Sequence, residues 1–239
     1  MPEDPLIAAL LQQNKNILAM DVCSLLDALR PLFREQRDAV EIVTKIDGEI
    51  RAGELPFTLV LPSLFAHEWN SNIAKVKNDL TKSLVTHKEQ SDYLDFLCKT
   101  LYGNNLDMPD VAQYKLDEEL EQTCSRVMSA AQTIEENNAA VLLAFERVKK
   151  GRAPSGRDLG IKGKIKPEFK DCVIFEEILA LGRELRAQGF AGKIVFVSSN
   201  TSDYGKTGQP FPEIAADLQT IQAEFASTLN YAYHIAAQK

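Results

Sequence analysis

Short apolar runs alternate with longer amphipathic stretches along this chain. Three of these runs, Ile17–Met20, Phe57–Leu61 and Ile194–Val197, contain almost only hydrophobic residues. Runs of this length between helical stretches are typical of strands that are buried on both faces of a parallel sheet. We therefore predict an α/β fold, with a central parallel sheet flanked by helices.

Apolar residues recur at helical spacing between and beyond these runs. The pattern predicts a short helix at about 5–13, helical segments over about 21–50, and a helix at about 171–188. The run at 194–197 is expected to be the last strand. A single helix over 212–236 is expected to close the chain.

The middle of the chain is expected to be mostly helical. Residues 70–147 show helical spacing, and the stretch from Leu116 to Lys150 is interpreted as one or two helices with their apolar residues on one face. We interpret the whole chain, 1–239, as a single domain with a large helical insertion at about 72–148.

Residues 149–170 differ in composition from the rest of the chain. Eight lysines and arginines stand there against Asp158 and Glu168, together with four glycines and two prolines. Such a segment is typical of an irregular loop. Because cationic side chains attract phosphate groups, we expect the loop to bind a phosphate backbone, with a solvated linker as the alternative. The candidate contacts are Arg152, Arg157, Lys162 and Lys164.

Composition narrows the class of protein. The net charge is −7, so a nucleic-acid partner would need a local basic patch. The four cysteines do not have the spacing of a zinc site. The first ten residues carry two acids and no basic head region, and no apolar run approaches the roughly 20 residues that span a bilayer. We therefore expect a cytoplasmic protein without a membrane partner.

Four acidic residues lie just after a predicted strand or near the start of a predicted helix. Asp21 directly follows the first strand, Glu68 falls early in the helix after the second, Asp171 opens a helix, and Asp203 trails the last apolar run. Ligands of an open α/β sheet collect at the carboxyl ends of the strands. Acids gathered there repel one another unless a cation lies between them, and oxygen ligands suit Mg²⁺ or Mn²⁺. Taken singly, each acid could instead cap a helix, form a turn or be solvated.

Several other α/β chemistries lack their motifs here. The position two residues after Asp21 is Cys23, where haloacid-dehalogenase-type phosphatases need a second aspartate. The first strand is not followed by a Walker phosphate loop or by GxGxxG, and the nucleophile elbow GxSxG is absent from the sequence. A metal held by carboxylates is therefore the favoured chemistry.

Four segments together resemble the motifs of PIN-domain ribonucleases. In order, they carry an aspartate at the end of the first strand, a proline followed by a helical glutamate, an aspartate that opens a helix, and a strand that ends in serines before an acid and an aromatic residue. These segments are 17–24, 61–68, 169–176 and 195–204. The resemblance covers 15–70 and 165–206, and the basic loop before the third acid resembles one PIN-like subfamily.

The resemblance implies a Rossmann-like PIN fold and a metal-dependent endoribonuclease. It implies that Asp21, Glu68, Asp171 and Asp203 are catalytic and hold Mg²⁺ or Mn²⁺ together with Asn200. The metal would lower the pKa of a bound water, and the resulting hydroxide would attack the phosphorus. Ser24 and Ser198 would contact the substrate, which is expected to be RNA, including single-stranded RNA.

Two departures from the family pattern keep alternatives open. Cys23 stands where a small polar residue is usual, and Asn200 stands at the usual fourth acidic position, three residues before Asp203. An asparagine ligates a metal through its oxygen but carries no charge. A catalytically weak PIN-like module that binds RNA, a protein partner or a second copy is therefore one alternative. A metal-dependent phosphatase of small substrates is another, although the long cationic loop suits a polymer better.

Overall fold

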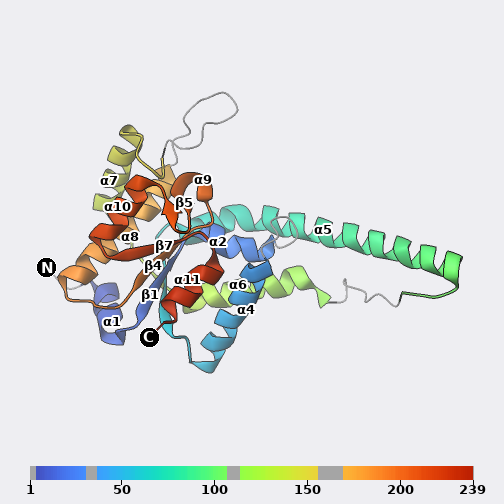
Figure 1. The fold of residues 1–239 in the computed structure, drawn as a ribbon. Helices are drawn as coiled ribbons and strands as arrows, with labels where there is room; N and C mark the ends of the chain where they lie inside the picture. Colours follow the sequence, from blue (N-terminus) through green and yellow to red (C-terminus); the bar gives the residue numbers. More distant parts are fainter. Residues whose placement is uncertain (1–3, 31–36, 107–113, 156–168, 239) are drawn as a thin grey trace.

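The computed structural model of the chain describes residues 4–30, 37–106, 114–155 and 169–238, in which helices surround a sheet of five parallel strands (Figure 1). The strands of this sheet are β1 (Asn16–Met20), β2 (Phe57–Leu61), β3 (Gln132–Thr133), β4 (Ile194–Val197) and β7 (Ala223–Ala226). A separate hairpin consists of β5 (Gly205–Lys206) and β6 (Gln209–Pro210). The helices are α1 (Pro5–Gln13), α2 (Val22–Leu26), η1 (Asp27–Leu29), α4 (Arg37–Ala52), α5 (Phe65–Tyr102), α6 (Leu116–Ala130), α7 (Asn138–Lys149), α8 (Phe169–Ala187), α9 (Thr201–Tyr204), α10 (Pro212–Thr220) and α11 (Leu229–Ala236).

The strand order determines where a ligand site can form. The order is β3-β2-β1-β4-β7, so the chain builds the sheet in one direction from β1 and then returns to add β4 on the other side. In β1, Ala19 lies opposite Val60 of β2 and Phe196 of β4. In an open α/β sheet, such a reversal leaves a crevice at the carboxyl ends of the two central strands, where ligands collect. In this sheet the crevice lies beyond Met20 and Val197.

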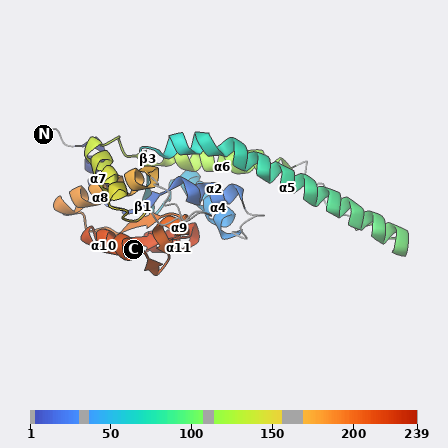
Figure 2. The same cartoon turned by 90° about the horizontal axis from the view of Figure 1, so that it is seen from above.

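Alternate strand residues contribute to two cores, one on each face of the sheet. Leu18 and Met20 pack into one core, while Ile17 and Ala19 pack into the other. Helices α2, α4, α5, α6 and α11 contribute to the first core, and α1, α8 and α10 contribute to the second (Figures 1 and 2). Burial on both faces explains why the strands read as uninterrupted apolar runs, and the predicted parallel sheet flanked by helices is confirmed.

The prediction of one helix over 212–236 is wrong. Helix α10 ends at Thr220, β7 follows as an edge strand beside β4, and α11 then closes the described part of the chain. Gln222 has a φ angle of 51°, which ends the helical course of the backbone. The strand has only four residues, and a run that short cannot be distinguished from part of a helix by its periodicity.

The segment predicted as a helical insertion contributes a strand to the sheet. Residues Gln132 and Thr133 form β3 and pair in parallel with Val60 and Leu61 of β2. A two-residue polar strand has no apolar run, so the hydrophobic pattern does not indicate it. The interpretation of 1–239 as one domain with an insertion at about 72–148 stays a prediction.

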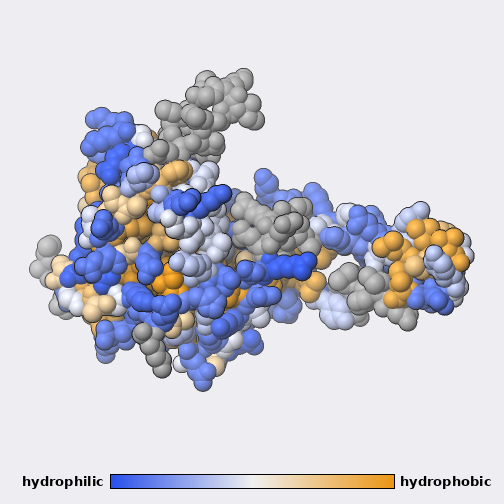
Figure 3. All heavy atoms as spheres, in the orientation of Figure 1, coloured by the Kyte–Doolittle hydropathy of each residue, from blue (hydrophilic) through white to orange (hydrophobic). Residues whose placement is uncertain are grey.

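Helix α5 extends beyond the rest of the described structure as an arm (Figures 1 and 2). Its first half packs on the sheet layer through Phe65, Trp69, Val76 and Leu80. With 38 residues, the helix is about 57 Å long at 1.5 Å per residue. Apolar side chains gather at its far end (Figure 3). None of the described helices, α5 included, is long and apolar enough to cross a membrane.

Candidate functional site

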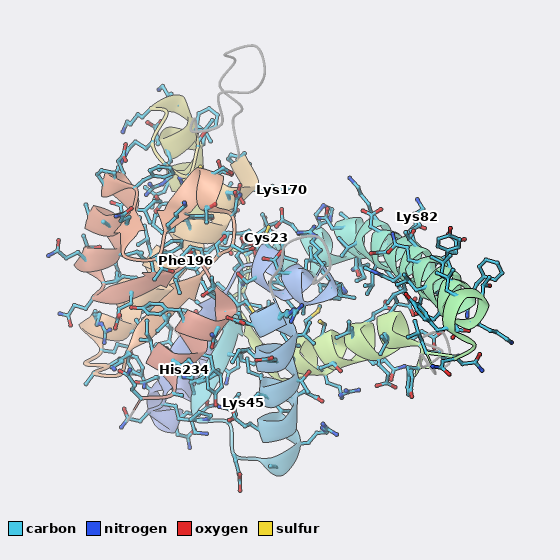
Figure 4. The ribbon with its side chains drawn as sticks, turned by 45° about the vertical axis from the view of Figure 1, so that its right-hand side comes forward. Cys23, Lys45, Lys82, Lys170, Phe196 and His234 are labelled. Atoms are coloured by element: carbon cyan, nitrogen blue, oxygen red, sulfur yellow. The ribbon has the colours of Figure 1, made fainter. Side chains whose placement is uncertain are left out.

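Three of the four predicted acids line one pocket at the carboxyl edge of the sheet. The pocket has a volume of about 370 Å³ and is lined by Glu68 of α5, Asp171 of α8 and Asp203 of α9, together with Asn200. We call it the acidic pocket. These residues come from segments far apart in the sequence, and the fold brings them together beside the crevice between β1 and β4. Cys23 and Lys170, labelled in Figure 4, also line the acidic pocket.

Asp21 lies at the end of β1 and is fully buried, directly before two residues that line the acidic pocket. Its backbone N–H donates to the Val197 carbonyl oxygen at 2.9 Å, and the Ser198 hydroxyl donates to its Oδ2 at 2.6 Å. These two bonds join the ends of β1 and β4. Asp21 stands at the N-cap position of α2, but its carboxylate makes no capping hydrogen bond there.

The second carboxylate oxygen of Asp21, Oδ1, is buried and makes no hydrogen bond within the described residues. Burial raises the pKa of Asp21, and this effect outweighs the Ser198 hydroxyl and the nearby amides of Val22 and Cys23, which lower it. A buried oxygen without a donor is a position that a cation or a water molecule would stabilise.

The thiol of Cys23 lines the acidic pocket beside the acids of the site. Burial raises the pKa of Cys23 most, and the charges of Asp21, Asp171 and Glu68 raise it further in that order. Three of the four predicted acids therefore act on one side chain, which stays a neutral thiol at physiological pH. Two of these three acids, Asp171 and Glu68, line the same pocket as Cys23.

Asn200 links two acids within the acidic pocket. Its Nδ2 donates to Asp203 Oδ2 at 2.6 Å and lies 3.5 Å from Asp171 Oδ2. Its side-chain oxygen accepts a bond from the Ser202 hydroxyl at 2.7 Å. Both Asn200 and Asp203 are thus part of the site, and the asparagine reduces the repulsion between the two carboxylates.

A buried aromatic cluster positions Asp171 and Asp203. Tyr204, the residue after Asp203, is fully buried and packs against Phe175 of α8 and Phe196 of β4, with ring centroids 5.9 and 5.2 Å apart. Its hydroxyl donates to the backbone oxygen of Asp171 at 3.0 Å. The first turn of α8 and the end of α9 are therefore fixed relative to each other, and the two carboxylates with them.

A second buried contact positions the start of α5, which carries Glu68. The Ser63 amide and hydroxyl donate to the Glu177 carboxylate of α8 at 3.0 and 2.5 Å. Burial raises the pKa of Glu177, and these bonds from Ser63 lower it. A serine just before a helix commonly caps it through its side chain. In the structure Ser63 bonds to Glu177 instead, because the two helices converge here, and α5 begins at Phe65 without a side-chain cap.

Two cationic side chains lie at the acidic pocket. Lys170 Nζ is 3.8 Å from Glu68 Oε1, and Arg30 pairs with Asp27 at 3.5 Å. Lys170 belongs to the basic segment identified in the sequence. Arg30 carried no sequence signal, because only the packing of η1 beside α5 brings it to this edge of the sheet.

The predicted substrate contacts have different positions. Ser24 and Ser198 are buried and do not line the acidic pocket: the Ser199 amide donates to Ser24 Oγ at 3.1 Å, and Ser198 donates to Asp21. Both hydroxyls take part in hydrogen bonds that hold the strand ends together, and neither side chain lines the acidic pocket. The guanidinium of Arg152 pairs with Asp217 at 3.2 Å and is also not part of the pocket lining. The remaining candidates, Arg157, Lys162 and Lys164, lie outside the described residues.

Two of the acidic side chains are engaged with other side chains of the pocket. Within the described ranges, no group of three or more His, Cys, Asp and Glu side chains is placed to hold a metal ion. Glu68 is near Lys170, and Asp203 accepts a bond from Asn200. The donors themselves, carboxylate and amide oxygens, suit a hard divalent cation.

Comparisons with known proteins provide no relative from which a function could be transferred. No protein-family model, no curated protein and no solved structure matches this chain. Its function must therefore be argued from the acidic pocket, the fold that builds it and the motifs in the sequence.

Proposed function

We propose that this chain is a PIN-like, metal-dependent nuclease that hydrolyses phosphodiester bonds, with RNA as its substrate. The observation that carries the proposal is the convergence of acids at the switch point of the sheet. Glu68, Asp171 and Asp203 line one pocket, and the buried Asp21 is next to it. A pocket between the two central strands is where α/β folds bind their ligands.

The donor set fits Mg²⁺ or Mn²⁺. Asp21 offers a buried oxygen that lacks a donor, and Glu68, Asp171 and Asp203 offer three more carboxylates, with the Asn200 oxygen as an uncharged ligand. When bound, such an ion supplies a hydroxide near neutral pH and stabilises the leaving oxygen. Glu68 and Asp203 would exchange their contacts with Lys170 and Asn200 for the ion.

The cationic residues at the acidic pocket would bind the phosphate of the substrate. Lys170 and Arg30 line the acidic pocket, so they are placed to pair with a phosphate that enters it. An arginine can bind a phosphate through two parallel hydrogen bonds, whereas a lysine acts as a point charge. These side chains would offset the repulsion between a phosphodiester and the four carboxylates.

One observation favours a second candidate, a PIN-like module that binds RNA with little or no cleavage. The uncharged Asn200 stands at the usual fourth acidic position and donates to Asp203. A pocket with weaker negative charge would hold a second metal less tightly. A cleavage assay that includes a small phosphomonoester separates both candidates from a phosphatase of small substrates.

The test is a cleavage assay with single-stranded RNA, single-stranded DNA and a small phosphomonoester, in Mg²⁺, Mn²⁺ or a chelator. We expect RNA cleavage that requires metal. Asp21→Asn should lower the rate about 100-fold or more, because a carboxylate that would hold the metal ion is lost. Asp92→Asn is the matched control, since it removes the same charge from the exposed part of α5. Cleavage in the chelator, or an Asp21→Asn variant as fast as wild type, would contradict the proposal.

A further inference from the structure

A second hollow, of about 640 Å³, opens at the carboxyl ends of β4 and β7. The described residues that line it are five hydroxyl side chains, one lysine and one tyrosine, and none of them is acidic. We call it the hydroxyl groove. Its lining residues are Ser199, Thr201, Lys206, Thr207, Ser227, Thr228 and Tyr231.

The hydroxyl groove is continuous with the acidic pocket. A third concave region, of about 470 Å³, shares Cys23, Arg30, Asn200 and Ser202 with the acidic pocket. The same region shares Ser199 and Thr201 with the hydroxyl groove. One concave surface therefore runs along the edge of the sheet, from the clustered carboxylates to the hydroxyl side chains.

The floor of the hydroxyl groove is fixed by hydrogen bonds. The Thr207 amide donates to Ser227 Oγ at 3.1 Å, the Ser227 amide donates to Thr207 Oγ1 at 2.8 Å, and the two hydroxyls are 2.9 Å apart. The hairpin that carries Thr207 depends on Gly205, whose φ is 91° and whose added Cβ would lie 2.7 Å from the Gln209 oxygen. A shape held in this way is organised before any ligand arrives, which lowers the entropy cost of binding.

A cationic and an aromatic side chain determine which ligands the hydroxyl groove could bind. Lys206 is exposed and makes no ion pair with a described residue. Tyr231 is 47% exposed in the first turn of α11, where its amide donates to Thr228 Oγ1 at 3.3 Å. A free ammonium attracts phosphate, an exposed aromatic ring offers a face for a nucleobase, and hydroxyls bond to sugar and phosphate oxygens.

We infer that the hydroxyl groove holds the nucleotides beside the scissile phosphate of a single-stranded polynucleotide. One base stacks on Tyr231, Lys206 pairs with a phosphate, and the strand continues past Ser199 and Thr201 to the acidic pocket. A single strand fits because its bases are free to stack on a side chain, whereas those of a duplex are stacked on each other. The inference rests on the proposed nuclease function for the direction of the strand, but binding in the groove can be measured without cleavage.

The experiment measures the binding of a 12-nucleotide single-stranded RNA and of a dinucleotide to the full chain carrying Asp21→Asn. Tyr231→Ala should weaken binding of the 12-mer about 10-fold or more and leave the dinucleotide unchanged, because only the longer strand reaches the hydroxyl groove. Lys206→Ala should reduce the slope of log affinity against log salt by about 0.7, the value for one phosphate contact of a single strand.

Matched controls separate the hydroxyl groove from general effects of substitution. Tyr231→Phe keeps the ring and should bind like the parent. Tyr93→Ala and Lys82→Ala remove the same side-chain types from the exposed part of α5 and should change neither affinity nor slope. Lys82 is labelled on this helix in Figure 4. A blunt duplex of the same length should bind with no sensitivity to Tyr231→Ala.

The outcomes for the groove and for the nuclease are distinct. If wild type cleaves RNA while Tyr231→Ala and Lys206→Ala bind the 12-mer like the parent, the groove assignment is overturned and the nuclease stands. If the two variants lose affinity but wild type does not cleave in metal, the groove stands and the nuclease fails. Absence of any binding to the 12-mer overturns the groove assignment as well.

Discussion

At the scale of single residues, Asp21, which we propose as a metal ligand, lies in an unfavourable environment. Its carboxyl group is fully buried, and burial raises its pKa above the ordinary value of 3.8. In the unfolded chain the group ionises near that value, whereas in the folded chain it resists ionisation. The free energy of unfolding therefore decreases as the pH rises from about 3.8 to the higher folded pKa, because the folded chain holds the proton more tightly in this range. Such a cost is typical of sites where function opposes stability.

Asp21→Asn should consequently stabilise the metal-free protein at pH 7. The amide keeps the shape, its oxygen can accept the bond from Ser198, and no charge is buried. We expect Tm to rise by about 2–4 °C, which corresponds to roughly 1 kcal/mol in a chain of this size. The difference should shrink as the pH falls toward 3.8, because the linkage between ionisation and unfolding then disappears. Asp92→Asn should show no such pH dependence, and a lower Tm for Asp21→Asn at pH 7 would contradict the account.

Metal should reverse this order of stabilities. If Asp21 contributes to a cation site, millimolar Mg²⁺ or Mn²⁺ stabilises the folded wild type by mass action and leaves Asp21→Asn nearly unchanged. Thermal melts with and without the ion, at fixed ionic strength, measure the difference. An equal rise in Tm on addition of the ion to both proteins would mean that the ion binds without Asp21.

At the scale of the elements, one buried arginine joins three helices on the face of the sheet that carries α8. Arg147 of α7 donates to Glu176 of α8 at 2.8 and 2.6 Å and to Asp217 of α10 at 2.7 Å. Arg147 and Glu176 are both buried. Because α8 also carries Asp171, this ionic network supports one side of the acidic pocket. Removing one partner of a buried pair leaves the other charge uncompensated.

Arg147→Ala should therefore cost about 3–5 kcal/mol, which lowers Tm by roughly 10 °C. Arg183→Ala is the matched control, because Arg183 lies 3.7 Å from the same Glu176 but is 48% exposed. An exposed ion pair contributes about 1 kcal/mol or less. Denaturant or thermal unfolding measures both variants, and similar losses for the two would mean that burial does not decide the energy of this network.

The elements also show how far the sequence could predict the structure. The strands β1, β2 and β4 are buried on both faces, so their apolar runs identified them directly. The short edge strands β3 and β7 have no comparable runs and were missed. The four acids could be identified because each follows a strand or opens a helix. Arg30, Arg147 and the hydroxyl groove could not, since they depend on contacts between residues far apart in the chain.

At the scale of the whole molecule, the two ends of α5 differ in burial: one end packs in the core and the other is exposed. The base carries Trp69, which is buried in the core and only 5% exposed. The far end carries Tyr93, Phe96 and Tyr102, which are 61%, 59% and 75% exposed (Figure 3). An apolar surface gathered on a protruding helix is unusual for an isolated monomer and is typical of surfaces that contact other molecules. The expectation of a protein partner or a second copy remains a prediction at this surface.

Replacing Tyr93, Phe96 and Tyr102 together by serine should leave the unfolding of the sheet nearly unchanged. Exposed side chains contribute little to the folded state, so each change should stay within about 0.5 kcal/mol. Trp69→Ala should cost about 3–5 kcal/mol, because it leaves a cavity where α5 packs on the core. Thermal melts at several protein concentrations, with light scattering to measure mass, test both statements. If the triple variant lost as much stability as Trp69→Ala, the end of the arm would be part of the cooperative core. If it changed only the mass in solution, the arm would be a contact between copies that the sheet and its pocket do not need in order to fold.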